Sequence, residues 1–398
     1  MKKNKRSLKF TAAGLAAAFL IFPTVAEADT HSRHGDDIII AVDGVENEQA
    51  ALLVHAAYTA DIWYNDGGVE NGWRYLDNLD VTAELDLERA IGWKGATAFI
   101  YGLYNNGHSL SELTGDGQTV SNIETGERAV RLHEAWIEQE FGASSSAKIG
   151  LFDLNSEFDA LETSSLFINS AHGIGSDIAQ TGENGPSIFP LTSLAVRIQT
   201  QLADGLSVRV AILDGVPGDP ERPTRTTIKL NDGALVIGEL DWTNENSRIL
   251  AGVWGYNKKQ DRLDGSGKST SNGYYLRGET LLREGTQGNI SAFARIGVAS
   301  DDVHPYGFFL SGGVAAEFGE KHMAGLAVAH ARSSDISRSP LADPELALET
   351  ETAIELTLAS QVSKHLSTQP SIQYIINPGA DKGLPDALAV GIRAAVGF

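Results

Sequence analysis

The chain of 398 residues carries 31 Lys and Arg against 52 Asp and Glu, a formal net charge of −21, and it has no cysteine. This acidic balance argues against nucleic acid as a partner, because the phosphate backbone attracts basic surfaces. Without cysteine no disulfide can form, so stability must come from packing or from a continuous hydrogen-bonded sheet.

The first 28 residues have the three parts of a secretory signal peptide. Five basic residues lie among the first nine, residues 15–25 are apolar, and Ala26-Glu27-Ala28 forms a small-x-small cleavage site. The alternative is an uncleaved membrane anchor. Cleavage leaves 26 Lys and Arg and 51 Asp and Glu, a net charge of −25. Residues 29–51 then form a short, acidic, periplasmic segment, and no later apolar run is long enough for a transmembrane helix.

From residue 52 onward, apolar and polar residues alternate with a period of two, which predicts strands. The runs are about ten residues long, the length that a tilted strand needs to cross a bilayer, whereas strands of soluble sandwiches average about six. The sixteen predicted strands span 52–64, 76–88, 93–104, 131–142, 146–154, 192–203, 205–214, 234–243, 247–257, 273–283, 289–299, 306–318, 322–332, 350–362, 365–376 and 387–398.

Short and long connections alternate between these runs. The short ones lie near residues 89–92, 143–145, 204, 243–246, 284–288, 319–321 and 363–364. Transmembrane barrels have this asymmetry, with short periplasmic turns and longer extracellular loops. We therefore predict an all-β protein in the outer membrane of a Gram-negative bacterium: a transmembrane antiparallel β-barrel of about 16 strands that occupies residues 52–398.

The last predicted strand, 387–398, alternates strictly. It is expected to pair with the first strand so that no edge is left unsatisfied in lipid. Its even-numbered residues would then face lipid and Arg393 the lumen. Phe398 would lie at the periplasmic interface, where the barrel-assembly machinery would recognise it. Four tryptophans close to strand ends are expected in the interfacial girdles: Trp63, Trp73, Trp93 and Trp242.

The two longest connections, about 105–130 and 155–191, are long enough to be functional. The second contains many apolar residues that can anchor it. In a porin a loop of this kind can fold inward and narrow the channel, and the alternative for each of the two is a mobile surface flap.

Several blocks spread in order over residues 52–398 resemble the carbohydrate-selective porin family of the OprB type. They are 75–79 (YLDNL), 92–96 (GWKGA), 120–124 (VSNIE), 131–139 (RLHEAWIEQ), 149–155 (IGLFDLN), 157–158 (EF), 189–190 (FP), 369–379 (QPSIQYIINPG) and 390–393 (VGIR). The resemblance implies a sixteen-stranded barrel through which sugars, often glucose and related monosaccharides, diffuse passively.

The strand face opposite the apolar one offers charged and aromatic side chains for a channel lining. The candidates are Arg131, Glu134, Trp136, Glu138, Arg197, Arg209, Glu239, Asp241, Arg277, Glu279 and Arg295. A lining of both signs suits a neutral polyhydroxy solute, because a ring of one sign selects ions. We expect the narrow zone at the first six residues, with Trp136 stacking on the solute. The alternative for the charged residues is that they form ionic ladders that stiffen the wall.

Other function classes have weaker support. Glu239 and Asp241 lie about 7 Å apart as any i,i+2 strand pair does, so they are weak evidence for a glycosidase. His133-Glu134 lacks the second histidine of a zinc motif. We therefore predict no catalytic residues, metal or cofactor. The predicted partners are monosaccharides, outer-membrane lipid and lipopolysaccharide. A general or anion-selective porin is the nearest alternative, and a barrel enzyme or adhesin is the next.

Overall fold

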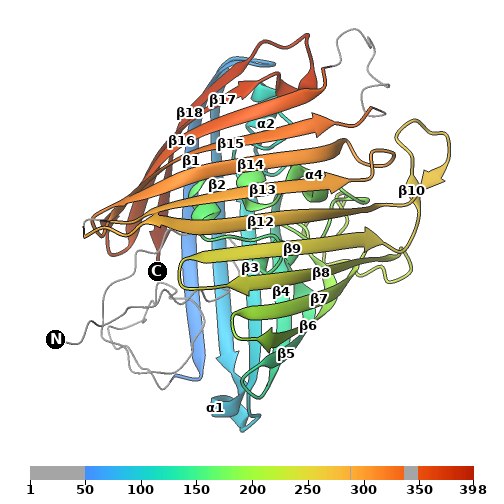
Figure 1. Cartoon of the computed structure of the whole chain (residues 1–398), viewed down its shortest axis with the longest axis vertical. Coiled ribbons are helices and arrows are strands. Elements are labelled where there is room, and N and C mark those ends of the chain that lie inside the picture. Colours follow the sequence, from blue (N-terminus) through green and yellow to red (C-terminus); the bar gives the residue numbers. More distant parts are fainter. Residues whose placement is uncertain (1–49, 287, 336–347) are drawn as a thin grey trace.

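The computed structural model describes residues 50–286, 288–335 and 348–398. In this part of the chain, sixteen antiparallel strands form one closed barrel in which each strand pairs with its neighbours in sequence and β1 pairs with β18 (Figure 1). The predicted signal peptide and nearly all of segment 29–51 lie outside the described residues. The prediction of a sixteen-stranded antiparallel barrel is confirmed.

Each predicted strand corresponds to an observed one, with ends that agree within four residues. The barrel strands are β1 Leu52–Gly67, β2 Gly72–Asp86, β3 Ala96–Asn106, β4 Arg128–Phe141, β5 Ser145–Phe152, β6 Ser193–Ala203, β7 Leu206–Asp214, β8 Ala234–Thr243, β9 Ser247–Tyr256, β12 Asn272–Arg283, β13 Ile290–Ala299, β14 Tyr306–Phe318, β15 His322–Ser333, β16 Thr350–Ser363, β17 Leu366–Ile376 and β18 Ala387–Gly397.

The remaining elements are short and lie in the connections. They are α1 Leu87–Ile91, α2 Ser111–Thr114, α3 Ser170–Gly173, α4 Ser176–Ala179, the 3₁₀ helices η1 Leu154–Ser156, η2 Thr163–Leu166 and η4 Pro378–Ala380, and the two-stranded sheet of β10 Gln260–Asp261 with β11 Lys268–Ser269. Within the described residues no helix is long and apolar enough to cross a membrane.

The two ends of the barrel differ. At one end, called the turn end, connections such as 142–144, 204–205 and 319–321 are short. At the other, the loop end, connections 107–127 and 153–192 are long. Leu52 and Phe398 both lie at the turn end, where the backbone N–H of Phe398 donates to the carbonyl of Ala56 at 2.8 Å. The alternation of short and long connections therefore follows the prediction.

The last strand closes the barrel against the first. In the register Ile392 lies opposite Ile62 and Arg393 opposite Asp61. Leu388, Val390 and Ile392 are 39–46% exposed on the outside, whereas Arg393 points inward and donates to Asp61 Oδ1 at 2.7 Å. The predicted orientation of this strand is confirmed.

The same inside-outside alternation holds around the wall. Large apolar side chains are exposed on the outward positions of the barrel strands. Examples are Ile100, Ile149, Ile198, Val253 and Leu276. Burying this surface in hydrocarbon is favourable, and all strand edges are paired, so the wall meets both requirements of a membrane-spanning barrel.

The prediction is wrong for one of the four tryptophans that were placed in the interfacial girdles. Trp73, Trp93 and Trp242 are exposed on the outside, but Trp63 is fully buried in the interior. Its indole Nε1 donates to Asp61 Oδ2 at 3.3 Å. Trp63 shares the inward parity of Asp61 in β1, and the prediction considered only its distance from the strand end.

Trp63 also packs directly against the backbone of Gly391, so that a side chain at position 391 would clash with its ring. A Cβ built on Gly391 would lie 2.3 Å from a ring carbon of Trp63 and 2.9 Å from the carbonyl oxygen of Ile62. We therefore expect Gly391→Ala to destabilise the barrel by about 1–3 kcal/mol through overpacking. The measurement is the temperature at which the folded band disappears on a heat-modifiability gel.

Gly238→Ala is the matched control, because the nearest atom to its Cβ would be 3.8 Å away. It should leave the transition temperature unchanged. Equal transition temperatures for both variants would contradict the close packing of Trp63 on Gly391.

Candidate functional site

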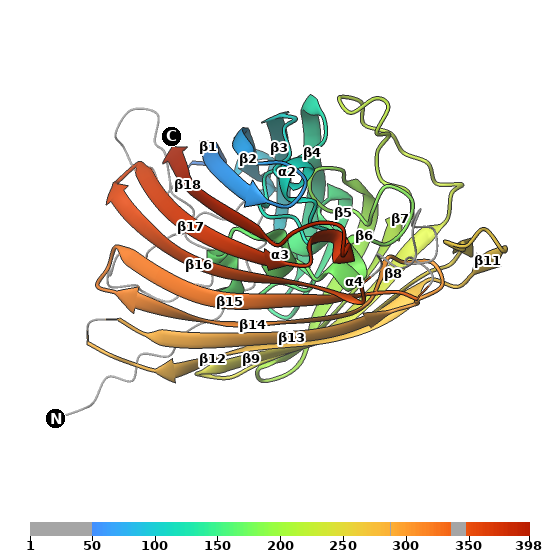
Figure 2. The ribbon, with the colours of Figure 1, turned by 90° about the horizontal axis from the view of Figure 1, so that it is seen from above.

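Two loop-end connections fold into the barrel. They are residues 107–127, here called inner loop 1, and residues 153–192, called inner loop 2. Figure 2 shows α3 and α4 of inner loop 2 enclosed by the strands. These two segments and the wall side chains that contact them therefore occupy part of the interior at this level.

Inner loop 1 is attached to the wall by hydrogen bonds and an apolar cluster. Glu351 of β16 accepts from the backbone N–H groups of Gly117 and Gln118 at 2.8 and 3.0 Å. Ser121 donates to Asp61 Oδ2 at 2.7 Å. Leu110, Leu113, Val120 and Ile123 pack with Trp63 and Leu76 of the wall. These contacts hold inner loop 1 against β1, β2 and β16 to β18.

Inner loop 2 reaches the same side of the barrel through its middle segment. Glu355 of β16, which is fully buried, accepts from the backbone N–H groups of Ile168 and Asn169 at 2.8 and 2.9 Å. Phe167 packs on Phe293 of β13, with ring centroids 5.7 Å apart. The segment therefore crosses the lumen from β5 toward β16.

Asp153 of inner loop 2 lies 3.5 Å from His133 of the wall, and Glu157 is the first loop carboxylate that pairs with Lys and Arg side chains. The Glu157 carboxylate lies 2.5 Å from Lys148 Nζ and 2.5 Å from Arg197 Nε. Burial alone would raise the pKa of Glu157, but the two cations outweigh burial and lower the pKa to about 2. Glu157 is therefore ionised, and its backbone carbonyl also accepts from Arg209.

Asp159 is the second loop carboxylate of this kind, and it joins two strands. Its carboxylate lies 3.2 Å from Arg277 Nη1 of β12 and 2.8 Å from Arg295 Nη2 of β13. Asp177 completes the group at 2.6 Å from Arg295 Nη1. None of these four side chains has exposed surface. Asp159 also adopts a left-handed backbone conformation, with φ of 53°, which the surrounding bonds must stabilise.

Further wall residues complete the network. Arg209 pairs with Asp241 at 2.9 Å and Arg248 pairs with Asp241 at 2.7 Å. Glu239 accepts from the backbone N–H of Asp159 at 2.9 Å. Glu279 accepts from the backbone N–H of Thr163 at 2.7 Å. Both glutamates thus bind the backbone of inner loop 2.

Seven of the eleven predicted site residues take part in this network: Arg197, Arg209, Glu239, Asp241, Arg277, Glu279 and Arg295. Alternation predicts their inward orientation, and each has 6% or less of its surface exposed. Most of their polar atoms are engaged by inner loop 2, by each other or by neighbouring wall residues, the exceptions being Arg209 Nε, Glu239 Oε1 and Arg277 Nε. The structure therefore places them as anchors of the loop and leaves little of their surface for a passing solute.

A second group lies nearer the turn end, around Trp136. Its indole Nε1 donates to Glu134 Oε2 at 2.8 Å. Lys148 Nζ lies 3.8 Å from its ring centroid, and Phe99 stacks on it with centroids 4.9 Å apart. Glu138 joins this group to the ion network by accepting from Arg197 at 2.8 Å. Trp136 and Phe99 are only half-buried, so part of this aromatic pair remains accessible.

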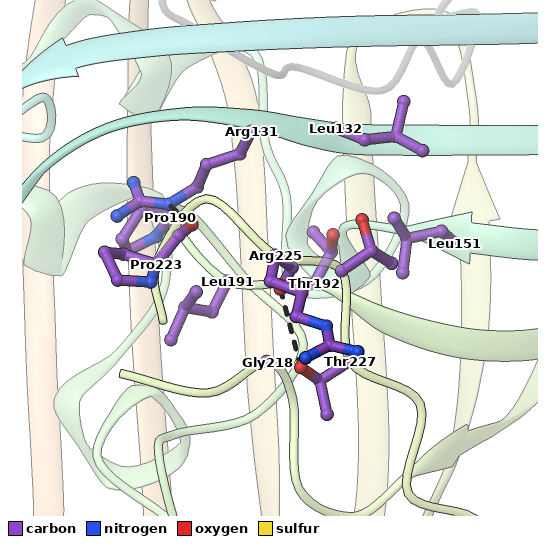
Figure 3. Close-up of a pocket in the computed structure, with 11 residues that line it drawn as sticks. Arg131, Leu132, Leu151, Pro190, Leu191, Thr192, Gly218, Pro223, Arg225 and Thr227 are labelled. Carbon is purple, nitrogen blue, oxygen red and sulfur yellow. Dashed lines mark hydrogen bonds between the residues drawn. The ribbon is translucent and has the colours of Figure 1, made fainter. Parts of the chain in front are cut away.

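Arg131 is separated from the Trp136 group. A β-bulge in β4 places both Arg131 and Glu134 on the inner face although their numbers differ by three. The guanidinium of Arg131 donates from Nε to the carbonyl of Pro223 at 3.0 Å. Arg131, Pro190 and Arg225 line a small pocket at the loop end, which Figure 3 shows. The predicted narrow zone therefore divides into two places.

Sequence reasoning missed several residues of the site. Lys148 and Phe99 have the inward parity of their strands and could have been found by extending the alternation. Glu157, Asp159 and Asp177 lie in a connection without periodicity, so their inward position has no signal in the sequence.

A closed barrel with an apolar outer wall and loops folded into its lumen defines an outer-membrane porin. The chain belongs to the carbohydrate-selective porin, OprB family, whose family model matches residues 70–398.

The chain is also similar to individual proteins, and the solved structures among them share its fold. Porin B of Pseudomonas aeruginosa is 24% identical in an alignment of 388 positions, and the match covers 84% of this chain and 84% of Porin B. The high-pH structure of Pseudomonas putida OprB superposes with a TM-score of 0.77 at 20% identity and covers 87% of this chain and 94% of that one. The outer-membrane channel DcaP of Acinetobacter baumannii has a TM-score of 0.53 at 13% identity, covering 87% and 97%.

The protein is thus a channel for the passive diffusion of carbohydrates across the outer membrane of a Gram-negative bacterium. Its turn end corresponds to the periplasmic side and its loop end to the extracellular side.

The anchoring of inner loop 2 can be tested at Glu355. Glu355→Ala leaves the buried N–H groups of Ile168 and Asn169 without their acceptor, which costs about 1–3 kcal/mol for each group. We expect the loop to move more freely, so that the single-channel conductance rises and fluctuates more in planar bilayers. Glu320→Ala, in the exposed turn 319–321, is the control. Identical conductance in the two variants would show that this contact does not position the loop.

Proposed function

We propose that the solutes are glucose-like monosaccharides and that they make their main contacts at the Trp136 group. The observation that carries this proposal is the half-buried aromatic pair of Trp136 and Phe99 beside the carboxylates of Glu134 and Glu138. Aromatic surface contacts the C–H groups of a sugar ring, while the buried carboxylates of Glu134 and Glu138 hold the Trp136 ring and Lys148 in place. Contacts of this kind are loose enough for the solute to leave.

In this proposal the other predicted residues act indirectly. Arg197, Arg209, Glu239, Asp241, Arg277, Glu279 and Arg295 position inner loop 2 and so set the width of the channel. Arg131 lies at the extracellular entrance. Lys148 joins the two groups, because it contacts both the Trp136 ring and Glu157. The protein acts as a channel and not as an enzyme.

Three further proposals concern the surroundings of the barrel. Residues 1–28 are a signal peptide that is cleaved on export. The outer wall and the acidic loops contact outer-membrane lipid and lipopolysaccharide. Phe398, which is 55% exposed at the turn end, is recognised by the barrel-assembly machinery.

Liposome swelling with the purified porin tests the sugar preference. Glucose, a zwitterionic amino acid and a disaccharide are compared at equal osmolarity. We expect glucose to enter faster than an amino acid of similar or smaller size, because the Trp136 group complements the sugar. Entry ranked by size alone would indicate a general porin.

The role of Trp136 is tested in the same assay. Trp136→Ala removes the aromatic surface and widens the channel, so we expect the absolute rates to rise. The ratio of glucose entry to amino-acid entry should fall toward the value given by size alone. Trp73→Ala, on the exposed outer wall, is the matched control and should keep the wild-type ratio. A wild-type ratio in Trp136→Ala would place the selectivity elsewhere.

A further inference from the structure

The cations of the wall around inner loop 2 obtain part of their counter-charge from the loop. Among the described residues, the wall contributes to these pairs six cations: Lys148, Arg197, Arg209, Arg248, Arg277 and Arg295. It contributes three carboxylates: Glu138, Glu239 and Asp241. Glu279, a fourth carboxylate of the wall network, accepts from the loop backbone at Thr163, so the wall has an excess of two positive charges.

Inner loop 2 supplies three carboxylates to the same ion pairs. They are Glu157, Asp159 and Asp177, and each lies between 2.5 and 3.2 Å from a cation of the wall. They reach the wall from a connection of about forty residues that has no strand of its own in the barrel. Through these direct contacts the three loop carboxylates more than offset the excess positive charge of the wall.

This balance bears on which solutes the channel admits. Arginines that line a narrow lumen without partners raise the local concentration of anions and select for them. The same arginines, paired at contact distance in a low-dielectric interior, produce only a small field beyond the pair. The position of the loop carboxylates therefore decides whether the basic wall acts on a passing solute.

We propose that Glu157, Asp159 and Asp177 are built-in counter-ions that determine the solute class of this porin: they neutralise the basic wall, so that uncharged solutes pass and anions are not favoured. These carboxylates are specificity-determining residues that need not touch the solute. The inference goes beyond the choice of sugar, because it concerns the discrimination between neutral and anionic solutes and holds whichever sugar is preferred.

The test removes charge while keeping the shape of each side chain. The variants are Glu157→Gln, Asp159→Asn and Asp177→Asn, singly and combined, with Glu183→Gln as the control. Glu183 lies in the same loop and is exposed. The measurement is the zero-current potential across a planar bilayer in a potassium chloride gradient, which gives the anion-to-cation permeability ratio. Each charge removed from the network should raise this ratio, and the combined variant should raise it most. Glu183→Gln should leave the ratio near that of the wild type.

A purely structural role is distinguished by a compensating variant. Asp159→Asn combined with Arg277→Gln removes one charge of each sign and leaves the anchor broken. If the carboxylates act as counter-ions, this double variant returns the permeability ratio toward the wild-type value. If they act only as anchors, the ratio of the double variant stays at that of Asp159→Asn or moves further from wild type.

Heat modifiability on a gel confirms that each variant is folded before its potential is measured. Should the combined variant fail to fold, Glu157→Gln and the compensating pair still give the comparison, because Glu157, with 9% of its side chain exposed, is less deeply buried than Asp159 and Asp177. An unchanged permeability ratio in the folded single variants, or a double variant that does not recover, would overturn the proposal.

Discussion

The interior of this porin depends on the pairing of buried charges between inner loop 2 and the barrel wall. Taking a charge out of water costs several kcal/mol, and the cost is recovered only when the partner and the remaining hydrogen bonds are in place. Arg277 and Arg295 illustrate this requirement, because neither has exposed surface and both contact Asp159. Without the loop these two arginines would lose their counter-ions, and without the wall the loop carboxylates would lose theirs. Only the arrangement in which they pair is favourable.

The same constraint explains the unusual backbone of the loop. Asp159 has a positive φ, a conformation that a residue with a Cβ rarely adopts. Its N–H donates to Glu239 while its carboxylate binds two arginines from neighbouring strands. These bonds come from rigid strands, so they can hold a strained segment at a fixed depth in the lumen. The loop needs no long helix to keep its place.

The sequence predicts those parts of the structure in which apolar and polar residues alternate regularly. The strands alternate with a period of two, and for that reason the barrel, its closure and the inward orientation of residues such as Arg197 and Arg295 were predictable. Trp63 was misplaced because its parity was not considered. The bulge near His133 shifts parity within β4, and no local signal in the sequence marks it. The connections between strands have no such alternation, so the loop carboxylates that pair with the arginines could not be predicted.

The arrangement separates two tasks that a channel lining must perform. Closely paired charges, such as those of Arg295 with Asp159 and Asp177, fix the geometry but have few free lone pairs or N–H groups to offer a solute. Half-buried groups, such as Trp136 and Phe99, retain surface that a solute can reach. Lys148 touches both sets, since it lies over the Trp136 ring and beside Glu157. A shift of the loop would therefore alter the aromatic group through this one side chain, so that the width of the channel and the chemistry of its contact surface are coupled.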